Sequence, residues 1–261
     1  RQRQMCIRDS FSGTQFTDIM RRMLKKLQTI YEYPVDIEFT VNFTDEDDFK
    51  INLVQCRPLQ VQGEGKRVEF PKNIEKDNIL FQFEGNFFGG GILESVDRII
   101  YVDPLHYTKL SLQEKYEIAR LVGRLNRQIE NREECHAMLL GPGRWGSTTP
   151  SLGVPVGFSE INNISVLGEI AYSDGNLMPE LSYGTHFFQD LVETGIFYIA
   201  IFPGEKGVTF NILWLEKFPN QLEEYAPDFA KYRNVVKVFD SSDENLKILA
   251  DVVKRKVICY Q

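Results

Sequence analysis

Apolar and polar residues alternate along residues 35–43. The apolar positions within this run are Ile37, Phe39, Val41 and Phe43. A period of two places successive side chains on opposite faces, so the run predicts a strand with one buried and one polar face. Residues 44–48 are mostly acidic and favour a turn, and residues 49–59 resume as a second β-rich run. The pattern therefore predicts a β-hairpin.

The register of this hairpin decides which polar side chains meet. If residues 45–48 form a four-residue loop, Thr44 pairs with Phe49, and Glu38 then lies opposite Gln55. Opposed residues have Cβ atoms about 4.5–5.5 Å apart, so one divalent cation can contact both side chains. A slip by one residue removes this pairing. The alternative is a hairpin whose polar face only meets water.

The same register places Asp36 opposite Arg57. A guanidinium is a better phosphate ligand than an ammonium, because its planar fork contacts two oxygens at once. Magnesium prefers oxygen ligands, and phosphoryl transfer needs positioning and neutralisation of the phosphate oxygens. A carboxylate, an amide and a guanidinium on one strand face therefore suit a metal-nucleotide site.

Helical spacing appears on both sides of the hairpin. An amphipathic helix begins near Phe16 and precedes the first strand. Further along, Ser111 and Glu114 form a capping box, and the apolar residues that follow recur at helical spacing. A helix is therefore expected over 112–130.

Strands and helices alternate over residues 79–261. Strands are expected over 79–83 and 98–102 across the loop at 89–91, and over 197–202 and 208–215 across the turn at 204–207. Further strands are expected over 137–140, 153–156, 164–172 and 233–239, and helices over 186–194 and 243–255. This alternation predicts an α/β or α+β domain with its own mixed sheet.

A glycine-rich turn follows the strand expected over 137–140. It reads Gly141-Pro142-Gly143-Arg144-Trp145-Gly146-Ser147. Such a turn can present backbone donors to an anion, with Arg144 as a candidate nucleotide contact. The turn lacks the lysine of a P-loop, however, and no helix obviously follows it. The alternative is a tight turn whose Trp145 packs on the core.

Two motifs in the hairpin resemble a known enzyme family. They are Asp36-Ile37-Glu38-Phe39 and Gln55-Cys56-Arg57-Pro58. Together with the preceding helix, residues 16–60 resemble the end of the nucleotide-binding domain of phosphoenolpyruvate synthase and pyruvate phosphate dikinase, which has an ATP-grasp-like fold. The resemblance implies that Glu38 and Gln55 ligate the magnesium of ATP and that Arg57 contacts the transferred phosphate as a catalytic residue. By the same resemblance, Asp36 supports the site.

The resemblance covers only the last part of such a domain. The lysine and arginine that family members hold over the phosphates have no counterpart here. We therefore expect the carboxy-terminal piece of a larger protein, inactive in isolation. Residues 1–10 resemble translated sequencing adaptor and are expected to be a non-native leader. The expected domains are the nucleotide-binding piece over 11–62, a linker over 63–78 and an α/β domain of unrecognised type over 79–261.

His186 resembles the phosphorylated histidine of the same enzymes. Their phosphocarrier domain presents it in a Gly-x-Thr-Ser-His segment at a helix start, and here Gly184-Thr185-His186 precedes an expected helix. Phe187 and Phe188 replace small residues of that pattern, and Phe197 stands where proline is expected. A catalytic phosphohistidine, a non-covalent site residue and a structural histidine therefore all stay open.

Composition narrows the class of partner. The 261 residues carry a formal net charge of −7 with a sequence pI near 5.2, which argues against nucleic acid. No apolar run reaches the length of a membrane span and no signal peptide is visible, so a cytoplasmic enzyme is expected. The four cysteines are scattered, which favours reduced thiols. Cys135 and His136 lack spaced partners for zinc.

Three functions fit the sequence. The first is Mg-ATP-dependent phosphoryl transfer of the phosphoenolpyruvate synthase type to a small-molecule acceptor. The second is an enzyme that keeps ATP and Mg²⁺ but joins them to the unfamiliar domain over 85–261. The absence of a pyruvate barrel favours this second function over the first. The third is a non-catalytic nucleotide-sensing or partner-binding module.

Overall fold

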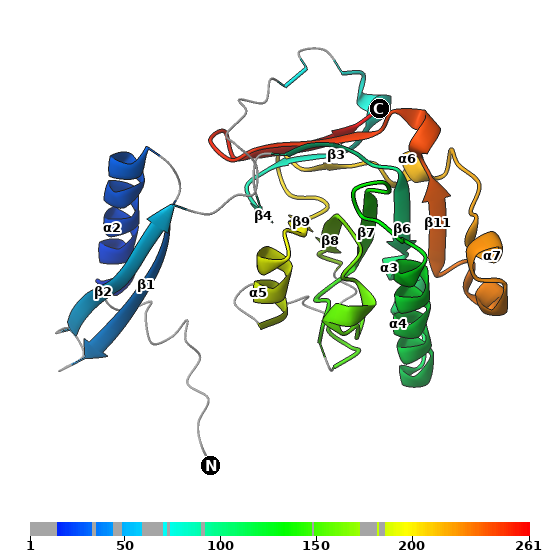
Figure 1. Ribbon diagram of the computed structural model, residues 1–261, viewed down its shortest axis with the longest axis horizontal. Coiled ribbons are helices and arrows are strands. Elements are labelled where there is room, and N and C mark those ends of the chain that lie inside the picture. Colours follow the sequence, from blue (N-terminus) through cyan, green and yellow to red (C-terminus); the bar gives the residue numbers. More distant parts are fainter. Residues whose placement is uncertain are drawn as a thin grey trace. The chain divides into compact units, whose positions relative to one another are not determined.

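The computed structural model describes most of the chain. The described residues are 15–32, 35–43, 49–58, 70–71, 74–89, 92–147, 149–172, 182 and 186–261. The chain forms two compact units that divide between Val61 and Gln62. Figure 1 shows the helices and strands of each unit.

The N-terminal unit packs one helix on a two-stranded sheet. Its elements are helix α2 (Phe16–Tyr31) and the antiparallel strands β1 (Val35–Phe43) and β2 (Phe49–Pro58). The centroid of the Phe16 ring lies 6.1 Å from that of Phe39 and 5.7 Å from that of Phe49. At the other end of the helix, a hydrogen bond with the Cys56 thiol raises the pKa of the Tyr31 hydroxyl. The helix therefore contacts the apolar face of the hairpin at both of its ends.

A β-bulge sets the register of this hairpin. Phe39 pairs with Leu53, whereas the adjacent Glu38 pairs with Gln55, so Val54 is an extra residue on β2. Such a bulge absorbs one residue and lets the strands stay paired on either side of it. The polar residues of β1 therefore still pair with polar residues of β2 on both sides of the bulge.

The expected pairing of Thr44 with Phe49 is wrong, because Phe43 takes that place. The connection between the strands is thus one residue longer than expected. The bulge offsets this difference, which is why Glu38 still lies opposite Gln55 as predicted.

A six-stranded sheet forms the centre of the C-terminal unit, in the order β11-β6-β7-β8-β9-β4. Its strands are β4 (Phe87–Phe88), β6 (Arg98–Val102), β7 (Ala137–Pro142), β8 (Val166–Ile170), β9 (Phe197–Ile201) and β11 (Val236–Asp240). Strands β6 to β9 are parallel, and β4 and β11 pair antiparallel at the two edges. Every residue of β7, β8 and β9 is buried, as in parallel sheets covered on both faces.

A second, antiparallel sheet covers one face of the first (Figure 1). It has five strands in the order β10-β3-β13-β12-β5, namely β3 (Ile79–Glu84), β5 (Ile92–Ser95), β10 (Thr209–Phe210), β12 (Lys247–Asp251) and β13 (Lys256–Tyr260). Phe81 and Ile248 of this sheet share one buried cluster with Ile99 and Ile199 of the six-stranded sheet. The two sheets therefore form a sandwich.

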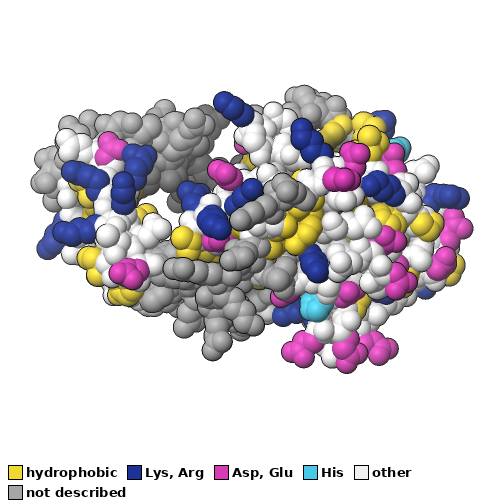
Figure 2. All heavy atoms as spheres, turned by 90° about the horizontal axis from the view of Figure 1, so that it is seen from above, with side chains coloured by type: hydrophobic (Ala, Val, Ile, Leu, Met, Phe, Trp, Pro, Cys, Tyr) yellow, Lys and Arg dark blue, Asp and Glu magenta, His cyan; other side chains and the backbone are white. Residues whose placement is uncertain are grey.

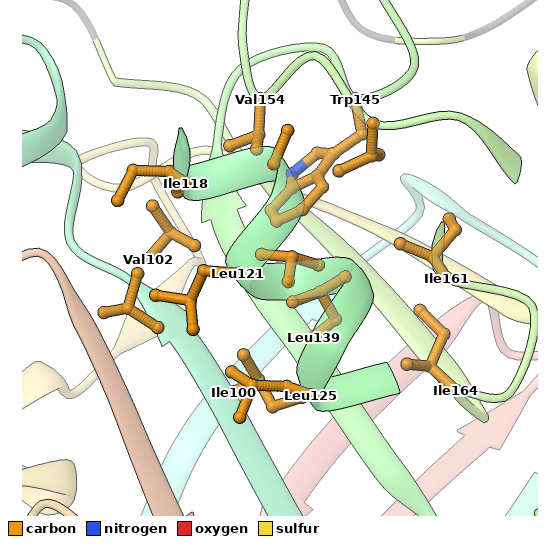
Figure 3. Packing of buried hydrophobic residues seen from close by; sticks show 14 of the residues in the cluster. Ile100, Val102, Ile118, Leu121, Leu125, Leu139, Trp145, Val154, Ile161 and Ile164 are labelled. Carbon is orange, nitrogen blue, oxygen red and sulfur yellow. The ribbon is translucent and has the colours of Figure 1, made fainter. Parts of the chain in front are cut away.

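Helices cover the opposite face of the six-stranded sheet. The main one is α4 (Leu112–Arg127), whose capping box is formed by Ser111 and Glu114 as predicted. Its Leu121 and Leu125 point toward Leu139 of β7 (Figure 3). Helices α3 (Pro104–Tyr107), α5 (His186–Glu193) and α7 (Leu222–Tyr225) pack into the same cluster as α4, whereas α6 (Ile212–Leu215) packs into the cluster between the two sheets. Short 3-10 turns lie at Lys76–Asn78, Phe158–Glu160, Pro227–Tyr232 and Ser242–Glu244.

The helix expected over 243–255 is wrong, because most of this segment belongs to the hairpin of β12 and β13. Ile248 is buried against the six-stranded sheet, and the adjacent Leu249 is buried on the other side with Ile79. A strand that is buried on both faces shows no alternation of polar and apolar residues, so periodicity alone cannot distinguish it from a helix.

Two further expectations about strands are corrected. The segment 208–215 is not one strand that pairs with β9, because β10 pairs with β3 and is followed by helix α6, whose Trp214 is fully buried. The strand expected over 153–156 is reduced to an isolated bridge between Gly143 and Gly153. Likewise, the two strands expected across the loop at 89–91 are β3 and β6, which lie in different sheets, and the short strands β4 and β5 come between them in the chain. The chain nevertheless combines helices with a mixed sheet and antiparallel sheets, which confirms the predicted α/β (α+β) fold class.

Candidate functional site

Polar side chains line one face of the hairpin in the N-terminal unit. Glu38 of β1 lies opposite Gln55 of β2, and both residues are exposed. Two pairs closer to the loop, the Asn52 side-chain amide donates to the Thr40 hydroxyl at 3.4 Å. Because the register is fixed over the whole hairpin, a carboxylate and an amide oxygen are presented side by side to solvent.

Asp36 and Arg57 are the next opposed pair, at the end of the hairpin away from the loop. Their backbones pair as the sequence predicted, and their side chains lie outside what the structure describes. The hairpin thus brings four candidate site residues, from two separate motifs, into two cross-strand pairs that are separated by the pair of Ile37 and Cys56.

His186 is the first residue of helix α5. The structure describes its backbone and not its side chain. The following Phe188 packs its ring at right angles to the rings of Phe88 and Tyr198, at centroid distances of 5.0 and 5.4 Å. This phenylalanine, which departs from the phosphocarrier pattern, therefore serves the core of the C-terminal unit.

The glycine-rich turn after β7 uses its backbone donors within the protein. The Gly143 amide donates to the Ile170 carbonyl oxygen at 2.9 Å, and the Arg144 amide donates to the Leu152 carbonyl oxygen at 2.8 Å. Trp145 is fully buried and its indole lies beside Val154 (Figure 3). These two amides are not available to an anion, so an anion at this turn would need side chains or other donors.

A buried carboxyl group, which the sequence reasoning missed, lies directly behind this turn. Glu169 of β8 is 0% exposed. It accepts hydrogen bonds from the Trp145 amide at 3.0 Å, the Ser182 amide at 2.8 Å and the Tyr198 hydroxyl at 2.5 Å. A glutamate inside the apolar run of a strand was the available signal, since Glu is almost never fully buried without partners.

Burial raises the pKa of Glu169, and the hydrogen bonds from Ser182 and Tyr198 oppose that rise. The Ser182 hydroxyl has two acceptors within reach, a Glu169 carboxyl oxygen and the Trp145 carbonyl oxygen at 3.1 Å. A hydroxyl has only one proton, so it cannot donate to both. A protonated Glu169 resolves this conflict, because it can donate to Ser182 while Ser182 donates to Trp145.

A third polar cluster joins Ser95, Asp97 and His136 at the amino-terminal end of β7. The Asp97 carboxylate lies 3.2 Å, and the Ser95 hydroxyl 3.3 Å, from the same ring nitrogen, Nδ1 of His136. A catalytic triad needs the acid and the nucleophile on different ring nitrogens, so these three residues do not form one. Within the described ranges, no group of three or more His, Cys, Asp or Glu residues is placed to hold a metal ion.

On the face of the C-terminal unit seen in Figure 2, acidic and basic side chains lie among one another. Of the helices that the structure describes, none combines the length and the apolar character needed to cross a membrane.

Comparison with protein families gives one match to the chain. Residues 3–78 match the family described as pyruvate phosphate dikinase, AMP/ATP-binding domain. Comparisons with curated proteins and with solved structures give no match. The matched segment contains helix α2, both hairpin strands and all four residues of the two cross-strand pairs. The amino-terminal part of the chain is therefore similar to the AMP/ATP-binding domain of pyruvate phosphate dikinase, the family that the two hairpin motifs predicted.

Proposed function

We propose that the polar face of the β1–β2 hairpin is one wall of an Mg-ATP site, and that the parent protein transfers a phosphoryl group from ATP to a small-molecule acceptor. The observation that carries this proposal is the pairing of Glu38 with Gln55 within a segment that matches an AMP/ATP-binding domain. The expected location of such an enzyme is the cytoplasm.

The donor set suits magnesium. Glu38 supplies a carboxylate and Gln55 an amide oxygen, and both residues are exposed and opposed on adjacent strands. Magnesium in nucleotide sites is held by one or two carboxylates together with phosphate oxygens and water. Two protein ligands from the hairpin are therefore enough. When bound, the metal would neutralise charge on the phosphate oxygens.

Arg57 is proposed as the phosphate contact. Its backbone is paired with that of Asp36, two residues from Gln55 along the same strand. Positions 55 and 57 are two apart in β2, so they belong to the same set of alternate strand positions. A guanidinium there can bind two phosphate oxygens at once and stabilise the charge of the transferred group.

We propose that the N-terminal unit is completed by further parts of the nucleotide-binding domain. Among its described apolar residues, only Phe16 and Met20 are buried, while Ile30 and Val54 are 66% and 64% exposed. A small unit in which only two described apolar side chains are buried has little hydrophobic stabilisation of its own. The lysine and arginine of the family's phosphate site would come from those further parts.

The test is ATP turnover by the complete parent protein. Glu38→Ala and Arg57→Ala are each expected to lower turnover about 10³-fold or more, the size of effect seen when a phosphate-binding arginine is lost. Asn52→Ala is the matched control, because Asn52 lies on the same face, next to Thr40. It should leave turnover within about twofold, less than 0.5 kcal/mol in activation free energy.

Circular dichroism of each variant shows whether the fold persists. Near-normal turnover in both Glu38→Ala and Arg57→Ala would remove the hairpin from the active site. If the parent binds Mg-ATP through these residues but turns none over, the nucleotide-sensing function replaces the transferase.

A further inference from the structure

A small cavity lies at the carboxyl ends of the parallel strands of the C-terminal unit. Its volume is about 10 Å³, room for about one water molecule. Gly143 at the end of β7 and Tyr172 after β8 line it, together with Tyr107 and with Lys115 of helix α4. In α/β sheets, ligands bind outside the carboxyl ends of the strands. The cavity is therefore at the edge of the sheet where a ligand is expected.

Among the described residues that line this cavity, Lys115 is the only charged one. The residue is only 9% exposed, and its ammonium lies 5.3 Å from the centre of the Tyr107 ring. Among the residues that the structure describes, no carboxylate forms an ion pair with it. A buried charge without a counter-ion is costly, and a cation–π contact compensates only part of that cost.

The acidic neighbours of Lys115 on helix α4 are engaged elsewhere. Glu114 accepts from the Ser111 amide at 2.8 Å in the capping box. Glu117 accepts from Lys231 at 2.7 Å and from the Tyr232 hydroxyl at 2.6 Å. Neither carboxylate is therefore free to neutralise the lysine.

The position of Lys115 within α4 increases the local positive potential. The helix begins at Leu112, so Lys115 lies at the end of its first turn. The amino-terminal end of a helix carries a partial positive charge and favours anions over cations. Burial also lowers the pKa of the Lys115 ammonium. Both effects would be relieved by an anion in the cavity.

We propose that this cavity binds one oxygen of a small oxyanion, phosphate or carboxylate, with Lys115 as its cationic ligand. The volume accepts a single oxygen atom, so the rest of the ligand stays at the mouth of the cavity. The site lies wholly within the C-terminal unit, and it does not depend on nucleotide binding by the hairpin.

The test is a titration of the full ¹⁵N-labelled chain with inorganic phosphate at constant ionic strength, followed by amide chemical shifts. Saturable shifts are expected at Thr108, Gly143 and Gly153, which line the cavity. Lys115→Met should weaken binding at least about tenfold, the loss of one charged hydrogen bond. Lys109→Met is the matched control: Lys109 is exposed and precedes the same helix, and its loss should leave the dissociation constant unchanged.

A parallel titration with acetate assigns the ligand class. Saturation by phosphate alone identifies a phosphoryl group, and saturation by acetate alone identifies a carboxylate. The proposal is overturned if neither anion gives saturable shifts, or if Lys115→Met and Lys109→Met weaken binding equally.

Thermal unfolding in anion-poor buffer gives an independent readout. Removing an uncompensated buried charge should raise the melting temperature of Lys115→Met by about 2–4 °C, whereas a fall would mean that the lysine is a structural partner of Tyr107.

Discussion

Glu38 and Glu169 are both strand glutamates with apolar neighbours, yet the two units place them in opposite environments. Glu38 lies on the exposed face of a two-stranded sheet. Glu169 is fully buried in a parallel sheet, where two backbone amides and two hydroxyl groups surround it. The Glu38 carboxylate can contact an external ligand, whereas the Glu169 carboxyl group is hydrogen-bonded within the protein.

This difference follows from how many faces of each sheet are covered by other helices and strands. The hairpin has a helix on one face, so its polar face stays open. The six-stranded sheet has helices on one face and a second sheet on the other, so polar groups inside it need internal partners. The exposed Glu38 is thus a candidate ligand, whereas the buried Glu169 is a structural element of the core.

The largest expected difference between the units is in core packing. Leu139→Ala in β7 removes a fully buried side chain, and we expect it to lower the free energy of unfolding by about 2–5 kcal/mol. Leu53→Ala in β2 removes a side chain that is 42% exposed and should cost less than about 1 kcal/mol. Urea denaturation of both variants measures the two costs. Equal costs would mean that the units are packed alike.

A smaller difference is expected for two tyrosine hydroxyls. Tyr198→Phe removes a donor to the buried Glu169, and we expect a loss of about 1–3 kcal/mol in unfolding free energy. Tyr31→Phe removes the hydroxyl that bonds Cys56 on the exposed hairpin and should leave the unfolding free energy nearly unchanged. The same denaturation experiment compares them. A Tyr198→Phe variant as stable as the unmodified protein would show that Glu169 does not need this donor.

The smallest effect concerns pH. Because burial raises the pKa of Glu169 above its ordinary value of 4.5, the folded protein keeps a proton that the unfolded chain loses above that pH. The stability from this group is therefore complete below pH 4.5 and decreases as pH rises toward the folded pKa, by at most about 1.4 kcal/mol per pH unit. Glu169→Gln should abolish this slope. Unfolding free energies across a pH series test this, and a slope retained in Glu169→Gln would assign it to other groups.

Local sequence patterns predicted the elements whose own residues show a clear periodicity or a capping motif. The alternation from Ile37 to Phe43 predicted β1, and the capping box of Ser111 and Glu114 predicted the start of α4. The pairing of Glu38 with Gln55 was also predicted, although the loop was one residue longer and a bulge restored the register. These features depend on residues close in sequence, which is why the sequence alone specifies them.

Features that depend on distant partners were not predictable in this way. The segment around Ile248 and Leu249 became a strand because it is buried between two layers, and such a run has no strand period. The Trp145 and Ser182 amides meet Glu169 only once the sheet is formed, since the loops that carry them follow different strands.

The sequence by itself determined the hairpin, its two motifs and their similarity to a nucleotide-binding domain, because each depends on residues within a short segment. Only the tertiary structure decided which strands share a sheet, that Glu169 is buried among donors, and that Lys115 lines a cavity without a carboxylate partner among the described residues. The physical reason is that burial and pairing depend on the layers that cover a residue, and those layers come from segments far apart along the chain.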